Sequence, residues 1–205
     1  MLKTAAEMSL LSAIVYYHYD SINSDLLSWG WKDWYWFDTE GTQAFVLAPK
    51  KDDDRIIICF RGTEPTQMSD VFADLKAWPK RSKEKGLVHF GFVEALDKIY
   101  PKIEECVERI SLKLRDETRV ICTGHSLGAA LATICASRID AHELYTFGSP
   151  RVGNAAFIKE MKSDKIKHYR FVNNNDVVTK VPFAKWVIGM VENFNILITM
   201  EILEK

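Results

Sequence analysis

The sequence predicts an α/β fold built on a mixed, mostly parallel sheet flanked by helices. From residue 119 onward, short strand-like runs alternate with helical patterns, which is the rhythm of parallel strands joined by crossover helices. Two earlier apolar runs, 42–48 and 55–60, are separated by Pro49 and the charged "KKDDD", as in two strands joined by a turn. The 205 residues contain no internal repeat, low-complexity tract or linker, so we expect a single domain over 1–205.

The elements that precede this alternation follow from the same kind of pattern. We expect a first helix over residues 4–19. The tryptophan-dense "WGWKDWYWFD", residues 29–38, is typical of an aromatic strand or hairpin on the edge of the sheet, and an interfacial or sugar-stacking surface is the alternative. Apolar residues at helical spacing predict one helix over 64–79 and a longer one over 92–114, which Pro101 should kink or restart.

The alternation itself supplies three strands and two helices. Each β-branched run ends in a turn, and each helical pattern carries small or apolar residues that would face the sheet. The predicted strands are 119–124, 143–149 and 168–176, and the predicted helices begin at Leu127 and after Asn154.

Composition argues against several classes of function. The 27 Lys+Arg and 28 Asp+Glu residues give a formal net charge of −1, so no strong field would attract nucleic acid or an anionic membrane. The cysteines form no C-x-x-C pair and stand in apolar runs, which is typical of buried free thiols and favours a reducing compartment. The five histidines show no metal-ligand spacing, so we expect no metal site.

Neither a signal peptide nor a membrane span is predicted. Glu7 interrupts the short apolar piece at the N-terminus, and no small-residue cleavage site follows cleanly, so we expect an amphipathic helix there. The most apolar late stretch, 186–203, is broken by Glu192, Asn193, Asn195 and Glu201, which argues against stable membrane insertion. These features favour a cytoplasmic location.

The stretch "RVICTGHSLGAALATICA", residues 119–136, carries the main functional signal. It places Ser126 between a strand and a helix, with Gly124 and Gly128 two residues away on either side. A serine on such a turn is held in strained backbone geometry, and side chains at the two glycine positions would collide with the strand or the helix. The pattern therefore predicts a serine nucleophile on a strand-to-helix elbow.

With the elbow in place, the chain closely resembles the class 3 lipase family, the fungal-lipase-type branch of the α/β-hydrolases. The resemblance runs in family order from residue 42 to 182 and implies a serine hydrolase that cleaves carboxylic esters of lipids through an acyl-enzyme, a lipase or carboxylesterase that needs no cofactor. Past Pro182 it stops, so the C-terminal part is shortened or altered relative to the family. The matching segments are "TQAFVLA", "IICFRGTEPT", "VHFGFVEALD", "TGHSLGAALAT", "YTFGSPRVGN" and "RFVNNNDVVTKVP".

The resemblance also implies a role for each site residue. Ser126 would be the nucleophile, and the backbone N–H groups of Thr63 and Leu127 would form the oxyanion hole, with the Thr63 hydroxyl as a further donor. Asp176 would be the triad acid that orients the histidine. Two alternatives stay open: Thr63 could be an ordinary turn residue, and Asp176 could simply cap the turn after Asn173-Asn174-Asn175.

Other residues around the site receive supporting roles from the same resemblance. His125 would be structural, because its side chain would point away from the reacting face, while Arg61 and Asp74 would staple the oxyanion loop. The family implies a mobile lid after the oxyanion threonine, here 64–79, which would open on a lipid–water interface. A fixed amphipathic helix packed on the core is the alternative.

The catalytic histidine is missing from its expected place. The family order is Ser, Asp, His, yet no histidine follows Asp176. His168 opens the strand that leads to Asp176 and should lie roughly 20 Å or more from the catalytic end. His89 is the only conceivable substitute, although its family counterpart is not the base.

Three hypotheses remain at this point. The chain is a working esterase or lipase whose base comes from an unexpected place or from outside the chain. It is a shortened or altered hydrolase with little turnover, retaining roughly a thousandfold catalysis from its oxyanion hole and binding. Or it is a non-catalytic module that binds lipid or acyl chains. The sequence decides neither the substrate nor the oligomeric state.

Overall fold

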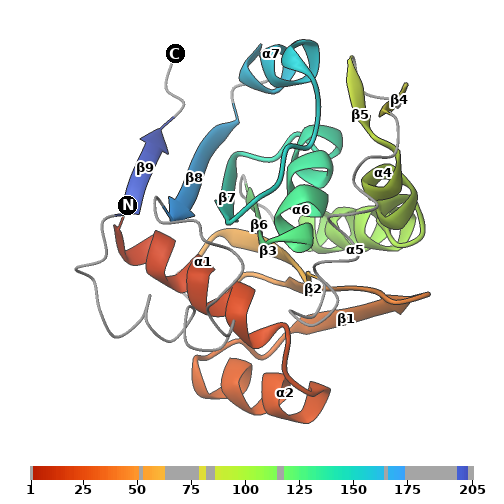
Figure 1. Ribbon diagram of the computed structural model, residues 1–205. Helices are drawn as coiled ribbons and strands as arrows, with labels where there is room; N and C mark the ends of the chain where they lie inside the picture. Colours follow the sequence, from red (N-terminus) through yellow and green to blue (C-terminus); the bar gives the residue numbers. More distant parts are fainter. Residues whose placement is uncertain are drawn as a thin grey trace.

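A twisted sheet forms the centre of the computed structural model, with helices on both of its faces (Figure 1). The structure describes residues 2–50, 53–62, 79–81, 86–114, 118–163, 166–173 and 198–202. The helices are α1 (Leu2–Ile14), α2 (Tyr19–Ser28), α4 (Phe90–Asp97), α5 (Tyr100–Lys113), α6 (Leu127–Arg138) and α7 (Ala155–Ser163). The strands are β1 (Trp34–Thr39), β2 (Thr42–Leu47), β3 (Arg55–Phe60), β4 (Pro79–Arg81), β5 (Leu87–His89), β6 (Arg119–His125), β7 (Glu143–Phe147), β8 (Lys167–Asn173) and β9 (Ile198–Ile202).

The sheet is parallel at its centre and antiparallel at both edges, which confirms the predicted mixed α/β fold. Its order is β1-β2-β3-β6-β7-β8-β9, with parallel pairing from β3 to β8 and antiparallel pairing elsewhere. Phe60 in β3 pairs with Gly124 in β6, and Gly124 pairs with Thr146 in β7. The carboxyl ends of these three strands therefore meet at one edge, the place where open α/β sheets carry their sites.

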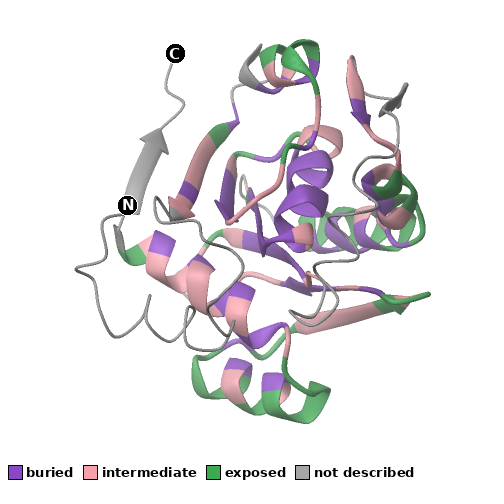
Figure 2. Ribbon diagram, in the orientation of Figure 1, coloured by how far each residue is buried: buried purple, intermediate pink, exposed green. Residues whose placement is uncertain are grey.

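Two apolar cores lie on opposite faces of the sheet. Successive residues of a strand point to opposite faces, so Ile58 and Phe60 join the core of α4, α5 and α6, while Ile57 and Cys59 join that of α1 and α2. Figure 2 shows these buried positions in the central strands and on the inner faces of α1 and α6. All four cysteines are buried and free, as the sequence predicted.

Several predicted elements are confirmed. The second half of the aromatic stretch, from Trp34, forms β1 on the edge of the sheet, and the two runs after it form β2 and β3. The long helix is interrupted at residues 98–99 and restarts as α5, with Pro101 in the first turn, where a missing N–H is tolerated. No helix in the described part of the chain is long and apolar enough to cross a membrane.

The first helix and the C-terminal region differ from the prediction. α1 ends at Ile14, because the N–H groups of Tyr16 and Tyr17 donate to carbonyls three residues back and tighten the last turn. The separate α2 was not predicted, since it buries only Ile22 and Leu26, too few residues to show a helical period. Nor was β9, which pairs with β8. The predicted helix over 64–79 lies almost entirely outside the described residues, which resume in β4 at Pro79.

Candidate active site

Ser126 occupies a strained turn between β6 and α6. Its φ of 53° and ψ of −123° fall in a region that non-glycine residues avoid, at a cost of about 1–3 kcal/mol. The surroundings hold it there: its N–H donates to the Phe147 carbonyl at 2.9 Å, and its carbonyl accepts from Ala129 at 3.0 Å. The structure thus has the elbow geometry that the sequence predicted for this serine.

The flanking glycines are required by close contact between backbones. A Cβ on Gly124 would lie 2.8 Å from the Ala129 nitrogen and closer still to the Gly128 carbonyl group. A Cβ on Gly128 would lie 2.9 Å from the carbonyl carbons of Phe60 and Arg61 at the end of β3. Real Cβ atoms do not come this close to backbone, so both positions exclude a side chain, as predicted.

The loop that follows β3 is pressed against the elbow. Gly62 lies so near that an added Cβ would stand 2.6 Å from the His125 carbonyl oxygen and would overlap the Tyr16 hydroxyl. The next residue is Thr63, the predicted oxyanion donor, which lies outside the described residues. Gly62 therefore brings the start of the predicted oxyanion loop to the elbow, one peptide bond before Thr63.

Leu127, the other predicted oxyanion donor, is the first residue of α6. The first N–H groups of a helix have no partner within the helix and stand at the positive end of its dipole. This position suits a backbone donor to a developing oxyanion beside Ser126. Asp176 lies outside the described residues, and so do Asp74 and residues 64–78 of the lid segment.

The side chain of His125 turns toward α1. Its Nδ1 stands 3.3 Å from the Tyr16 hydroxyl, and the two rings meet edge to face with centroids 6.3 Å apart. Burial lowers the pKa of His125 to about 3, so the imidazole is neutral near pH 7. This arrangement supports a structural role for His125.

Tyr16 is a residue that sequence reasoning missed. Its ring lies under the Arg61 guanidinium at 5.6 Å, and Arg61 in turn donates to the Gln43 side chain at 2.9 Å. Tyr16 thus contacts the elbow through His125 and the oxyanion loop through Arg61 and Gly62. Nothing in the sequence marks it, because Tyr16 and His125 are 109 positions apart.

His89, the candidate substitute base, is half-buried at the start of α4. Both of its ring nitrogens are buried and make no hydrogen bond to any residue that the structure describes, so it is not bonded to Ser126 here. Its ring packs on Phe92 with centroids 4.6 Å apart. The His89 backbone N–H donates to the Val152 carbonyl at 2.9 Å, which ties this segment to the loop before α7.

His168 lies in β8, two strands away from β6, which leads to Ser126. It lies opposite Leu144, which pairs with Cys122, four residues before Ser126. The separation from Ser126 is therefore about 13 Å along the strand direction, plus two interstrand spacings of about 5 Å each across the sheet. The predicted separation of roughly 20 Å or more was counted to the Asp176 end of the strand, which lies outside the described residues, so it stays a prediction. His168 Nε2 lies 2.9 Å from the Thr146 hydroxyl, so the ring has a different partner.

The two remaining histidines have partners away from Ser126. His142 Nδ1 accepts from the Val120 N–H at 3.1 Å, and His18 faces Asp20 on the surface. In the described part of the chain, no group of three or more His, Cys, Asp or Glu side chains is arranged to hold a metal ion.

Comparison with known proteins identifies the family of this chain. The family model described as lipase (class 3) matches residues 57–186. Triacylglycerol lipase OBL1 of Arabidopsis thaliana is 28% identical over 191 residues, 69% of this chain and 37% of that protein. Phospholipase A(1) DAD1, chloroplastic, of the same plant is 30% identical over 177 residues, 72% of this chain and 40% of that protein.

A solved structure shares the fold. The structure described as "A serine protease triad forms the catalytic centre of a triacylglycerol lipase" superposes with a TM-score of 0.69 at 26% identity, covering 90% of this chain and 76% of the other. The chain spans less than half the length of the two plant relatives.

Proposed function

Because the chain belongs to the class 3 lipase family, we propose that it is a serine hydrolase that cleaves carboxylic ester bonds of lipids. The observation that carries the proposal is the Ser126 elbow, held at a positive φ with α6 behind it and Gly62 against it. Both named plant relatives act, by their names, on lipid esters, one on triacylglycerol and one on phospholipid. We therefore propose a lipid ester, met at a lipid–water interface, as the substrate class.

The reaction would proceed through an acyl-enzyme. The Ser126 hydroxyl loses its proton to a base and attacks the ester carbonyl, whose oxygen becomes an oxyanion held by the N–H groups of Leu127 and Thr63. The tetrahedral intermediate expels the alcohol, which takes the proton from the base. Water then attacks the acyl-enzyme by the same route and releases the carboxylic acid. Asp176 would orient the base.

The source of the base is the open step of this proposal. The hydrogen bonds described for the rings of His125, His142 and His168 lead to Tyr16, Val120 and Thr146. Among the histidines, His89 is the best candidate for the base, because its imidazole makes no hydrogen bond to any residue that the structure describes. An imidazole from outside these 205 residues is the alternative.

Hydrolysis of p-nitrophenyl butyrate, together with labelling by a fluorophosphonate, tests the proposal. We expect the parent chain to turn over and to be labelled, and Ser126→Ala to lose both properties. His89→Ala should lower turnover by at least a hundredfold if His89 is the base, and His142→Ala serves as its control. Equal hydrolysis by the parent and Ser126→Ala, or an unlabelled parent, would refute a serine hydrolase and leave a lipid-binding module.

A further inference from the structure

A cavity of about 820 Å³ opens on the same face of the sheet as α6. It is formed by the loop 149–154, α7, β8 and Thr133 of α6. Ligand sites in proteins span roughly 300–1,000 Å³, so a small organic molecule would fit. The residues that line the cavity do not include Ser126, Leu127 or Gly62, and Thr133 stands seven residues along the helix from the serine, about 10 Å.

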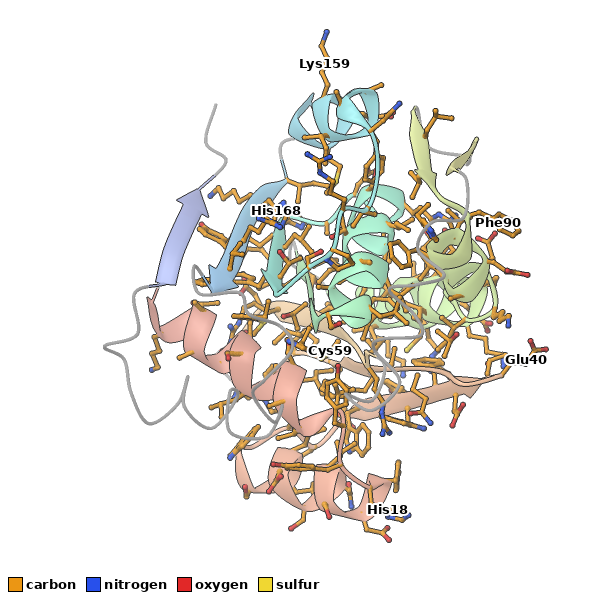
Figure 3. The ribbon with its side chains drawn as sticks, in the orientation of Figure 1. His18, Glu40, Cys59, Phe90, Lys159 and His168 are labelled. Carbon is orange, nitrogen blue, oxygen red and sulfur yellow. The ribbon has the colours of Figure 1, made fainter. Side chains whose placement is uncertain are left out.

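One part of the cavity is positively charged. Arg170 enters from β8 and Arg151 from the loop before α7, while the described lining residues include no carboxylate. Arg170 donates to the Ser149 carbonyl at 3.2 Å, which fixes its guanidinium at the loop. Neither arginine forms an ion pair with any residue that the structure describes. Lys159 also borders the cavity, but Figure 3 shows its ammonium group extending away from the protein.

The other part of the cavity is apolar. Met161 and Ile158 on the inner side of α7, Val152 in the loop and Ile166 before β8 supply hydrocarbon surface. Ala155, the first residue of α7, also lines the cavity and brings the positive end of that helix to it. A site with fixed positive charge beside hydrocarbon fits a ligand that combines an anionic head with an apolar tail.

His168 provides a built-in reporter for such a ligand. It lines the cavity, and its ring nitrogen Nε2 lies 2.9 Å from the Thr146 hydroxyl. Figure 3 shows His168 on β8. Burial, and then the positive charge of Arg170, lower the pKa of His168 to about 4. The negative charge of a bound anion would offset the positive charge of Arg170, so it would raise this pKa and move the ring resonances.

We propose that this cavity binds a carboxylate with an apolar tail, whose charge lies between Arg151 and Arg170. A fatty acid belongs to this class, and it is what the proposed hydrolysis would release. The choice of a fatty acid therefore rests on the proposed function, whereas the charge and the apolar wall of the cavity do not.

Titration of the 205-residue Ser126→Ala chain with decanoate, below the micelle concentration of decanoate, tests the site by calorimetry and by NMR of labelled histidine rings. We expect saturable binding that shifts His168 while His142 and His18 stay unmoved. Arg151→Gln and Arg170→Gln should each weaken binding by about tenfold or more, as expected when a hydrogen bond to a charged group is lost. Lys159→Gln, the matched control, should bind like the parent.

The opposite results are equally clear. If decanol bound as tightly as decanoate, the arginines would not be recognising the carboxylate. If inorganic phosphate bound as tightly as decanoate, the apolar tail would not be contributing to binding. Unmoved His168 resonances would place the ligand elsewhere. If Arg170→Gln fails to fold, the exposed Arg151 still decides the outcome. Because the serine is absent from the tested chain, failure here leaves the hydrolase proposal untouched, and inactivity of the parent chain leaves this site untouched.

Discussion

The two sides of the elbow are held by different means. On the α1 side, side chains join across the interface: the hydroxyls of Ser12 and Thr123 lie 3.0 Å apart, and Tyr16 reaches His125. On the α6 side, small residues let backbone touch backbone, with Gly124 and Gly128 facing each other and Ala129, Ala130 and Ala132 fully buried. Even the Thr133 hydroxyl donates within its own helix, to Ala129 at 2.7 Å.

This difference teaches how each side should respond to substitution. A contact between side chains can be weakened by removing one atom, and the loss is that of one hydrogen bond. A contact between backbones leaves no room for an added atom, so even a methyl group must displace a whole element. We therefore expect any added side-chain atom on the α6 side to be strongly destabilising. On the α1 side, we expect the loss of stability to depend on how many side-chain contacts a substitution removes.

Among the substitutions that test this difference, Gly128→Ala should reduce ester hydrolysis and stability the most. Its methyl group would meet the Phe60 and Arg61 carbonyl groups, pushing α6 and the Leu127 N–H away from β3. We expect ester hydrolysis to fall at least a hundredfold, with a loss of about 1–3 kcal/mol in the free energy of unfolding. Urea denaturation and p-nitrophenyl ester assays measure the two effects.

Gly91→Ala is the matched control for that variant. A Cβ on Gly91 would lie 3.4 Å from the His89 ring, an ordinary contact, inside α4. Stability should rise by about 0.5–1 kcal/mol, because alanine favours a helix over glycine. If Gly128→Ala and Gly91→Ala changed the free energy of unfolding alike, a close backbone contact at Gly128 would be refuted.

Acidification should destabilise both sides of the elbow. The unfolded chain protonates its histidines near pH 6.5, whereas His125 and His168 in the folded chain take up protons only near pH 3 and 4. The unfolded state thus binds more protons in this window, so stability falls as the pH falls from about 7 to about 4.

The size of this pH effect can be measured residue by residue. At pH 5, each of the two histidines should cost roughly 2 kcal/mol relative to pH 8. Urea denaturation of the parent at both pH values should show the drop, and His168→Gln should remove about half of it. A stability that is flat from pH 8 to pH 5 would contradict the buried, neutral state of both rings.

Tyr16→Phe should have the smallest effect, on the α1 side. It removes the hydroxyl that faces His125 Nδ1 while keeping the ring under Arg61. We expect a loss of about 1 kcal/mol in stability and a decrease in kcat of a few-fold with KM unchanged. Urea denaturation measures the loss of stability, and steady-state kinetics with p-nitrophenyl butyrate measure the decrease in kcat. A loss as large as that of Gly128→Ala would erase the distinction between the two sides.

The sequence predicts the α6 side of this site far better than the α1 side. Gly124, Ser126 and Gly128 lie within five residues of one another. One local pattern therefore predicts the turn, its strained backbone and its close contacts. Tyr16 was not predicted, because its role depends on a contact across 109 positions that no local period encodes. α2 was missed for a related reason, since two buried residues do not establish a helical period.

The contact of Gly62 and Gly128 with neighbouring main chain has an evolutionary consequence. Every amino acid except proline supplies the same N–H and C=O groups to the main chain. Contacts made by the main chain alone therefore do not depend on the side chains of the residues that make them. Sequences that preserve a few glycines can drift widely elsewhere and still inherit the same placement of the nucleophile. New specificities can then arise in the surrounding loops without rebuilding the centre.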